Sequence, residues 1–177
     1  MTQAVEDGAT VKIYYESRLA KVKLDRHQMD LIDNEYYNMQ VNEGVEDYIV
    51  DQSQKQMSRM EQIICDEDRI KQVVKDIIAH YEDRENLVAG KAMIVAYSRK
   101  AAYMMYKEIL EQRPSWNNKV KMVMTTNNQD SEEMAKLIGT KKTQKEREDE
   151  FRDLDSEFKI VIVVDMWLTG FDVPSLD

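Results

Sequence analysis

The sequence has few of the residues that cross-link or bend a chain. Its 177 residues include one cysteine, Cys65, two prolines and five glycines. A single cysteine cannot form an internal disulfide, which favours a reducing compartment, and few glycines and prolines favour a helix-rich chain with few tight turns. No apolar run reaches the ~18 residues of a membrane-spanning helix, and residues 1–7 lack the basic and apolar parts of a signal peptide. We therefore expect a cytoplasmic protein that does not contact a membrane.

Several sequence patterns that indicate a nucleotide, metal or nucleic-acid site are also missing. There is no G-x-x-x-x-G-K-[ST] phosphate loop and no evident acidic Walker-B strand, so no lysine is placed to hold the β and γ phosphates of a nucleotide. His27 and His80 stand alone, without Cys or His partners at zinc spacing. The net charge of −9 disfavours strong independent binding to nucleic acid, which needs clustered Lys and Arg. It does not exclude a local contact within a larger assembly.

The composition and the apolar runs predict a globular α/β protein. Hydrophobic residues make up 42% of the sequence and charged residues 33%, which suits one domain with a real core. Ile160–Val164 is a β-branched run with no polar face, a pattern typical of a strand buried on both sides of a parallel sheet. Residues 92–96 and 120–124 also predict strands, and the segments 98–112, 131–138 and 141–154 predict helices. Strands that alternate with helices indicate a parallel sheet with flanking helices.

The N-terminal half has a different pattern. Val11–Tyr15 predicts a short strand, whereas the sequence from about residue 16 to 81 is polar, helix-forming and free of proline. An apolar stripe from Ile70 to Ile78 predicts a helix that ends near Arg84. We therefore divide the chain into an opening segment with the first strand (1–18), a helical insertion (19–88) and an α/β lobe (89–177).

Three stretches of the second half resemble motifs of the second RecA-like lobe of superfamily 2 helicases and translocases. They are K-A-M-I-V-A-Y-S-R at 91–99, which resembles motif IV, Q-K-E-R at 144–147, which resembles the Q-x-x-R element, and V-D-M-W-L-T-G-F-D at 164–172, which resembles motif V. The sequence around motif V, which continues as V-P-S-L-D, is very similar to the corresponding sequence in the R (restriction) subunit of type I restriction enzymes. The stretch D-G-A-T-V-K-I-Y-Y-E-S-R at 7–18 also resembles that subunit. The resemblance is sharp over residues 7–18 and 91–177 and loose between them.

The resemblance implies a RecA-like lobe and assigns roles to residues near the carboxyl ends of its strands, where open α/β sheets bind ligands. The residues that it implies for contact with the DNA backbone are Ser98, Arg99, Gln144, Arg147, Asp165 and Thr169. Gly170 and Asp172 would face ATP in the cleft between two lobes, with the Asp172 carboxylate suited to ribose hydroxyls. No residue of this chain is assigned to catalysis or to a metal ion.

The longer enzyme that the resemblance implies is an ATP-hydrolysing type I site-specific deoxyribonuclease, in which this lobe would serve translocation of double-stranded DNA. Its cofactors would be ATP and Mg²⁺. Its partners would be DNA, the modification and specificity subunits, and the first motor lobe and nuclease domain of the same chain. Because the phosphate loop is missing and motif VI, with its arginine finger, would follow Asp177, we expect these residues alone to bind no cofactor and to hydrolyse no ATP.

The same residues also have plainer interpretations. Ser98 can simply cap its helix, Arg147 can be a solvated charge on a highly charged helix, and Thr169–Asp172 can be an ordinary turn. Glu157–Lys159 fits the E-x-K of metal-dependent nucleases only weakly, because such an enzyme needs a second carboxylate on a neighbouring strand. Cys65 is expected to be a buried small residue rather than a nucleophile.

Two other functions stay open at the level of the sequence. The lobe could belong to another superfamily 2 motor, such as a remodeller or a repair helicase, and the residues after Asp177 would decide between them. Alternatively, the chain could be a helical interaction module, in which acidic, Met-rich helices of residues 20–85 bind a partner protein.

Overall fold

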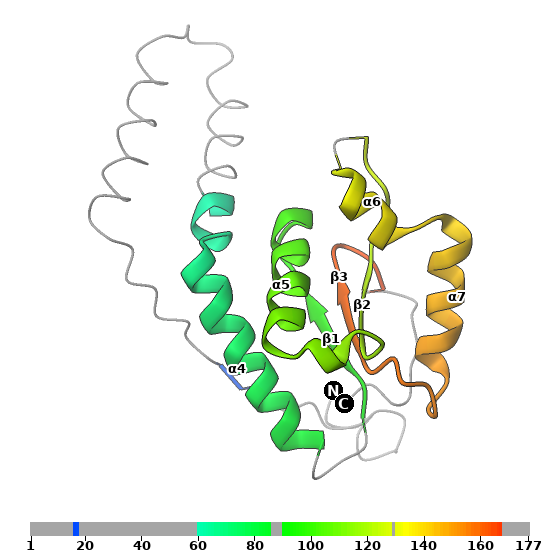
Figure 1. Ribbon diagram of the computed structural model, residues 1–177, viewed down its shortest axis with the longest axis horizontal. Coiled ribbons are helices and arrows are strands. Elements are labelled where there is room, and N and C mark those ends of the chain that lie inside the picture. Colours follow the sequence, from blue (N-terminus) through cyan, green and yellow to red (C-terminus); the bar gives the residue numbers. More distant parts are fainter. Residues whose placement is uncertain (1–15, 18–59, 86–89, 129, 168–177) are drawn as a thin grey trace, which may run out of the picture.

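The computed structural model describes residues 16–17, 60–85, 90–128 and 130–167 (Figure 1). Its elements are α4 (Glu67–Glu85), β1 (Ala92–Val95), α5 (Arg99–Gln112), η1 (Pro114–Trp116), β2 (Val120–Val123), α6 (Glu132–Ile138), α7 (Lys141–Arg152) and β3 (Ile160–Val163). The predicted α/β fold is confirmed. The predicted strand at 11–15 and most of the predicted helical insertion lie outside the described residues. No helix in the described ranges is long and apolar enough to cross a membrane.

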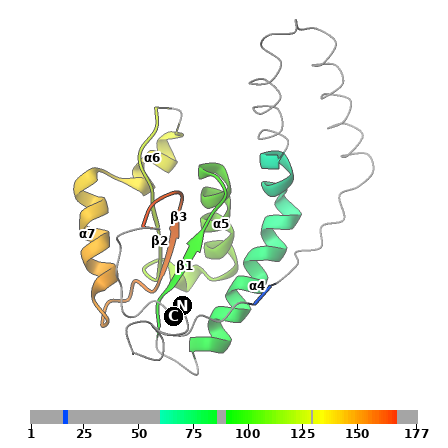
Figure 2. The same ribbon diagram turned by 180° about the vertical axis from the view of Figure 1, so that it is seen from behind.

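The three strands form one parallel sheet in the order β1-β3-β2, so the last strand of the sequence lies in the middle. Ile160 pairs with Ala92 on one side and with Val120 on the other. All four residues of β3 are at most 1% exposed, which confirms the predicted strand buried on both faces. Because the strands are parallel, their carboxyl ends lie at the same end of the sheet (Figure 1 and Figure 2).

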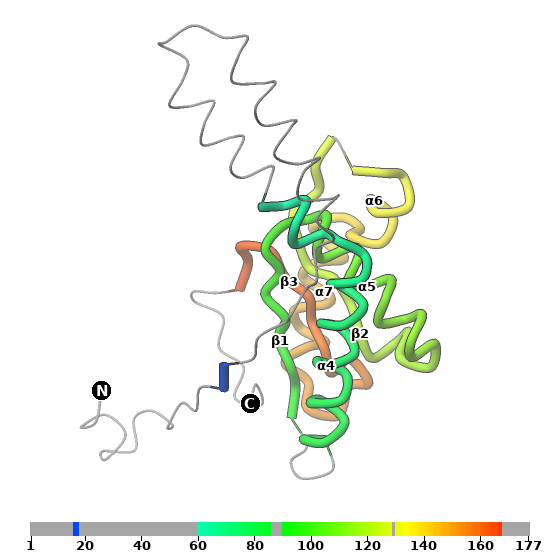
Figure 3. Tube along the Cα trace, turned by 90° about the vertical axis from the view of Figure 1, so that its left-hand side faces the viewer, coloured from blue at the N-terminus to red at the C-terminus, as the bar shows by residue number. Residues whose placement is uncertain are grey.

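Helices α4 and α5 cover one face of the sheet (Figure 3). The main core lies between these helices and the strands, and its buried side chains include Ile78, Ala102, Ile109, Met122 and Ile162. The buried side of α4 follows the apolar stripe predicted from the sequence. α4 therefore shares the core of the lobe, although it falls within the segment that the sequence assigns to a helical insertion.

A second, smaller core covers the other face of β3. It gathers Val123, Phe151, Phe158, Val161 and Val163, which are all fully buried. Phe151 belongs to α7, which lies beside β2 (Figure 1), and its ring packs against that of Phe158 at 4.9 Å between centroids. Both faces of the central strand are thus sealed from water.

Polar side chains fix where the helices begin. Hydroxyl groups cap three N-termini by accepting hydrogen bonds from backbone N–H groups: Ser98 from Ala101, Ser131 from Met134 and Thr140 from Thr143. These amides have no partner within their helices, so a capping hydroxyl stabilises the first turn. The caps account for the starts of α5, α6 and α7. Both ends of these helices lie within two residues of the ranges expected from the sequence.

A buried lysine ties the start of β1 to the end of α7. Lys91 is 2% exposed, and its ammonium group donates to the carbonyl oxygens of Glu150, Phe151 and Asp153 at 3.3, 2.5 and 2.5 Å. Carbonyls at a helix C-terminus lack intrahelical partners and carry partial negative charge, which favours a cation. Burial lowers the pKa of Lys91, and so does the neighbouring Lys159. All three donors of the ammonium are used in this contact.

We expect Lys91→Met to destabilise the fold, because the carbonyls at the end of α7 lose their buried donor. The free energy of unfolding should fall by about 1–3 kcal/mol, the usual cost of leaving buried polar groups unpaired. Urea denaturation followed by circular dichroism measures this change. Lys136→Met is the control, since the Lys136 side chain is 74% exposed. Equal stability of the two variants would contradict the role assigned to Lys91.

Candidate functional site

The loops that leave the three strands lie at one end of the sheet. We call this end the carboxyl rim and define it by residues 96–99 after β1, 124–128 and 130 after β2, and 164–167 after β3. Ligands of open α/β sheets bind at this end. The carboxyl rim contains Ser98, Arg99 and Asp165, three of the residues that the sequence assigns to the DNA backbone.

Ser98 is the N-cap of α5. Its Oγ accepts a hydrogen bond from Ala101 N at 3.2 Å, so the plainer interpretation of this residue is confirmed, and its contact with DNA stays a prediction. Burial raises the pKa of the Cys65 thiol, although a hydrogen bond with Ser98 acts in the opposite direction. Cys65 is 7% exposed, as predicted, and lies next to the carboxyl rim as a neutral, buried side chain.

Arg99 holds the loop that follows β2. One guanidinium nitrogen, Nη2, donates to both carboxylate oxygens of Asp130, and the other, Nη1, donates to Thr125 O. The Asp130 side chain is 5% exposed and also accepts from Asn127 N at 2.7 Å. Burial by itself would raise the pKa of Asp130, but the hydrogen bonds from Arg99 and Asn127 outweigh burial and lower it. The pair therefore joins the first turn of α5 to the loop after β2.

Asp130 was not predicted from the sequence. It stands 31 positions from Arg99, and no local pattern links residues so far apart. The one local signal is an acidic residue directly before Ser131, the N-cap of α6. That signal suggests a loop end and gives no hint of an ion pair.

The Q-x-x-R pair of α7 points into the protein. Gln144 Nε2 donates to Met124 O at 2.8 Å. Arg147 donates to Met122 O at 2.8 Å and to the carbonyls of the last two residues of α6 at 2.7 and 3.0 Å. Burial lowers the pKa of the Arg147 guanidinium group. The alternative of a solvated surface charge is therefore wrong for Arg147, and the contact of both residues with DNA stays a prediction.

These hydrogen bonds close the outer edge of β2. Alternate residues of a strand turn their backbone polar groups to opposite sides. Lys119 O accepts from Ile160 N of β3, so the carbonyls of Met122 and Met124 point away from β3. The Q-x-x-R pair supplies the donors that a neighbouring strand would supply, and it covers an edge that would otherwise offer unpaired acceptors.

Asp165 is exposed at the carboxyl rim, two positions after the last residue of β3. Its φ is 52° and that of Trp167 is 63°, left-handed values that are uncommon for residues with a side chain and typical of turns. The Trp167 ring packs against Phe151 at 5.7 Å between centroids, which anchors this turn on the smaller core. The other residues assigned to DNA and ATP lie outside the described residues: Thr169, Gly170 and Asp172.

The E-x-K stretch makes ordinary loop contacts. Glu157 accepts from the Asn118 side chain at 3.0 Å, and Lys159 donates to Leu154 O at 2.7 Å. Across the described part of the chain, no group of three or more His, Cys, Asp or Glu side chains could hold a metal ion. The structure thus adds nothing in favour of a nuclease centre at Glu157–Lys159.

Two curated proteins match almost the whole chain. Over 98% of its length it is 40% identical to a provisionally named type I restriction enzyme MjaIXP endonuclease subunit of Methanocaldococcus jannaschii. Over 98% of its length it is 31% identical to the type I restriction enzyme HindI endonuclease subunit of Haemophilus influenzae. The resemblance to type I restriction R subunits is confirmed. The chain spans 16% of the length of each of these subunits, and no protein-family profile and no solved structure matches it.

We expect Arg147→Met to destabilise the fold, because three backbone carbonyls lose a charged donor. The free energy of unfolding should fall by about 1–3 kcal/mol, as measured by urea denaturation. Lys145→Met on the same helix is the matched control, because Lys145 is exposed and such surface changes stay within about 0.5 kcal/mol. If both variants stayed within that range, the edge-closing role of Arg147 would be wrong.

Proposed function

We propose that the chain is part of the R subunit of a type I restriction-modification enzyme. In that subunit it contributes the second motor lobe, which serves ATP-driven translocation of double-stranded DNA. This translocation is coupled to cleavage of the DNA. The observation that carries the proposal is the similarity over 98% of the chain to two proteins named as endonuclease subunits of such enzymes. The three motif-like stretches support the motor role, and a parallel sheet offers one rim at which strand-end loops reach a ligand.

The carboxyl rim suits contact with a nucleic-acid backbone rather than with bases. Hydroxyl and amide side chains are exposed at residues 125–128, on the same rim as Ser98, and such groups bind phosphate without reading sequence. Positive charge is scarce there, because Arg99 is paired with Asp130 and the first turn of α6 is acidic. We therefore expect weak binding of DNA by this lobe alone, with stable binding only in the assembled enzyme.

ATP with Mg²⁺ is the cofactor that this function requires. The lysine that holds its phosphates would come from the first motor lobe, since this sequence has no phosphate loop. Gly170 and Asp172 would face the nucleotide from this chain. A glycine lets the backbone approach a ligand closely, and the Asp172 carboxylate can accept hydrogen bonds from ribose hydroxyls.

The chain would then lie in a cytoplasmic complex with modification and specificity subunits, in the same polypeptide as a first motor lobe and a nuclease domain. The names of the two relatives favour this assembly over a remodeller or a repair helicase. The rival helical interaction module is less well supported, because α4 buries its apolar stripe in the core of the lobe and does not present it to a partner.

The test uses the longer polypeptide assembled with its partner subunits. Asp172→Ala should slow ATP hydrolysis and DNA translocation at limiting ATP by about tenfold or more, the loss expected when one nucleotide contact worth ~1.4 kcal/mol is removed. Translocation is measured by displacement of a triplex-forming oligonucleotide and hydrolysis by phosphate release. Lys136→Ala, at an exposed position, is the control and should leave both rates unchanged.

Unchanged turnover of the Asp172→Ala enzyme at limiting ATP would remove the role assigned to this carboxylate. The purified 177-residue chain should show no DNA-stimulated ATP hydrolysis. Robust hydrolysis by that chain would show that ATP binding and hydrolysis need no other lobe. It would contradict the proposal that the first motor lobe supplies the phosphate-binding lysine.

A further inference from the structure

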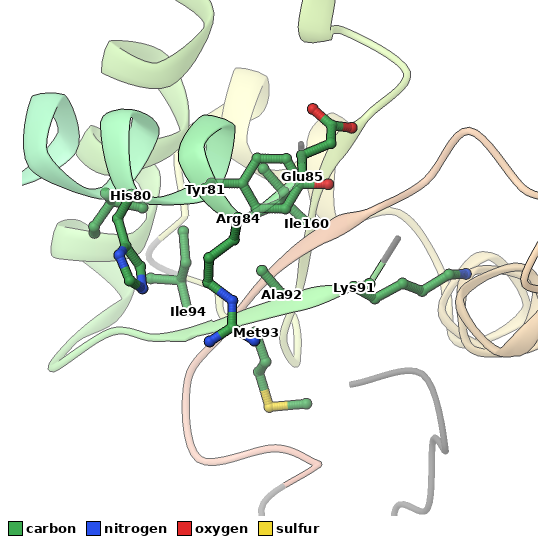
Figure 4. Close-up of a pocket in the computed structure, with 11 residues that line it drawn as sticks. His80, Tyr81, Arg84, Glu85, Lys91, Ala92, Met93, Ile94 and Ile160 are labelled. Atoms are coloured by element: carbon green, nitrogen blue, oxygen red, sulfur yellow. The ribbon is translucent and has the colours of Figure 1, made fainter. Parts of the chain in front are cut away.

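One loop of the carboxyl rim consists of uncharged polar residues. Residues 125–128, which follow β2, read T-T-N-N, and their side chains are exposed within the described part of the chain. We call them the T-T-N-N loop. Figure 4 shows a cavity of about 310 Å³ at the opposite end of the sheet, where Ala92 and Ile160, the first residues of β1 and β3, line it. A ligand of the carboxyl rim would therefore meet this loop and not that cavity.

One ion pair holds the T-T-N-N loop to the rest of the lobe. Arg99, at the start of α5, donates through Nη1 to Thr125 O and through Nη2 to the Asp130 carboxylate. Asp130 accepts from Asn127 N through the same carboxylate, and its own N–H donates to Asn127 O at 3.0 Å. The backbone of the loop is thus fixed at Thr125 and at Asn127 by the same two side chains. They come from the segments that follow β1 and β2, on either side of β3.

The charges around the loop are balanced. The Asp130 side chain is 5% exposed and that of Arg99 is 25% exposed, and the two opposite charges are in contact. The next acidic residues along the chain, Glu132 and Glu133, lie 2.9 and 3.8 Å from lysine ammonium groups. A phosphate at this loop would meet hydroxyl and amide groups, and each such hydrogen bond is weak in net terms. Weak contacts give binding only if the loop is already held in place, because ordering it costs free energy.

We propose that Arg99 and Asp130 are positioning residues for DNA, which hold the T-T-N-N loop so that its hydroxyl and amide groups bind phosphates of the DNA backbone. Contacts of this kind carry no sequence information, as a motor that moves along DNA requires. Arg99 acts on DNA through the loop and does not itself touch phosphate. The inference rests on the proposed motor function, and it adds the loop after β2 and Asp130, which belong to none of the three motif-like stretches.

The variant Asp130→Asn gives opposite results for positioning and for direct contact. If Arg99 itself bound phosphate, loss of the neighbouring negative charge would free its guanidinium group and tighten the binding of DNA. Positioning predicts weaker binding, because in either orientation the new amide turns an NH₂ donor towards the donor Nη2 of Arg99 and releases the loop. The dissociation constant should rise about three- to tenfold, the equivalent of one or two neutral hydrogen bonds.

The measurement is fluorescence anisotropy of a short labelled DNA duplex titrated with the longer polypeptide. Glu132→Gln is the matched control, because it removes the same charge two positions away, from a side chain that is 87% exposed. The control should bind DNA as tightly as the wild type or more tightly. An unchanged or lower dissociation constant for Asp130→Asn would overturn the inference.

A second variant separates positioning from a general loss of stability. Thr126→Ala combined with Asn128→Ala removes two exposed side chains of the loop and leaves the ion pair intact. This double variant should weaken DNA binding by a similar factor at an unchanged melting temperature. Adding Asp130→Asn to it should weaken binding little further, because a positioning residue acts through these side chains. Unchanged binding by the double variant, or fully additive losses, would overturn the inference.

Failure of the motor function itself would give a different result. If the wild-type polypeptide with its partner subunits showed no DNA-dependent ATP hydrolysis, the proposed function would be wrong, and the inference with it. If DNA stimulated ATP hydrolysis in the wild type while Asp130→Asn bound DNA as tightly as the wild type, the inference alone would be wrong.

Discussion

The structure depends on β3, a strand that must be paired on both edges and covered on both faces. Its four residues are β-branched and at most 1% exposed, so its backbone polar groups need partners on both sides. β1 and β2 provide these partners, α4 and α5 cover one face, and Phe151 and Phe158 cover the other. Because the last strand in sequence is the middle strand in space, the turn at Asp165 leaves the sheet between the loops that follow β1 and β2. This order of strands is what assembles the carboxyl rim.

With β3 enclosed, the outer edge of β2 still carries backbone acceptors that need partners. Gln144 and Arg147 donate to the carbonyls of Met124 and Met122, so within the described residues side chains rather than a strand cover this edge. Gln144 and Arg147, which the resemblance assigns to DNA, thus stabilise the fold. Arg99 also stabilises it, because its guanidinium group is paired with Asp130. In the function that we propose, hydroxyls, amides and backbone N–H groups of the rim contact phosphate. Such groups suit a motor that must move along DNA of any sequence.

Features with a local cause were predictable from the sequence. The β-branched run at 160–163 indicates a doubly buried strand, Ser98 indicates a helix start, and the stripe of α4 indicates one buried face. The strand order was not predictable, because the three apolar runs are alike and nothing local tells which of them pair. The bonds of Lys91 and Arg99 were also missed, since their partners stand about 60 and 31 positions away. Roles at Thr169–Asp172 rest on resemblance alone, because these residues lie outside the described part.

Amide hydrogen exchange of β3 itself, followed by NMR in the 177-residue chain, tests the enclosed central strand most directly. We predict that the amides of residues 160–163 exchange only when the whole lobe unfolds, so that their opening free energy equals the unfolding free energy from denaturant titration. Exchange of any of these amides through a local opening of clearly lower free energy would show that β3 is not enclosed. The account of β3 as the enclosed centre of the lobe would then be wrong.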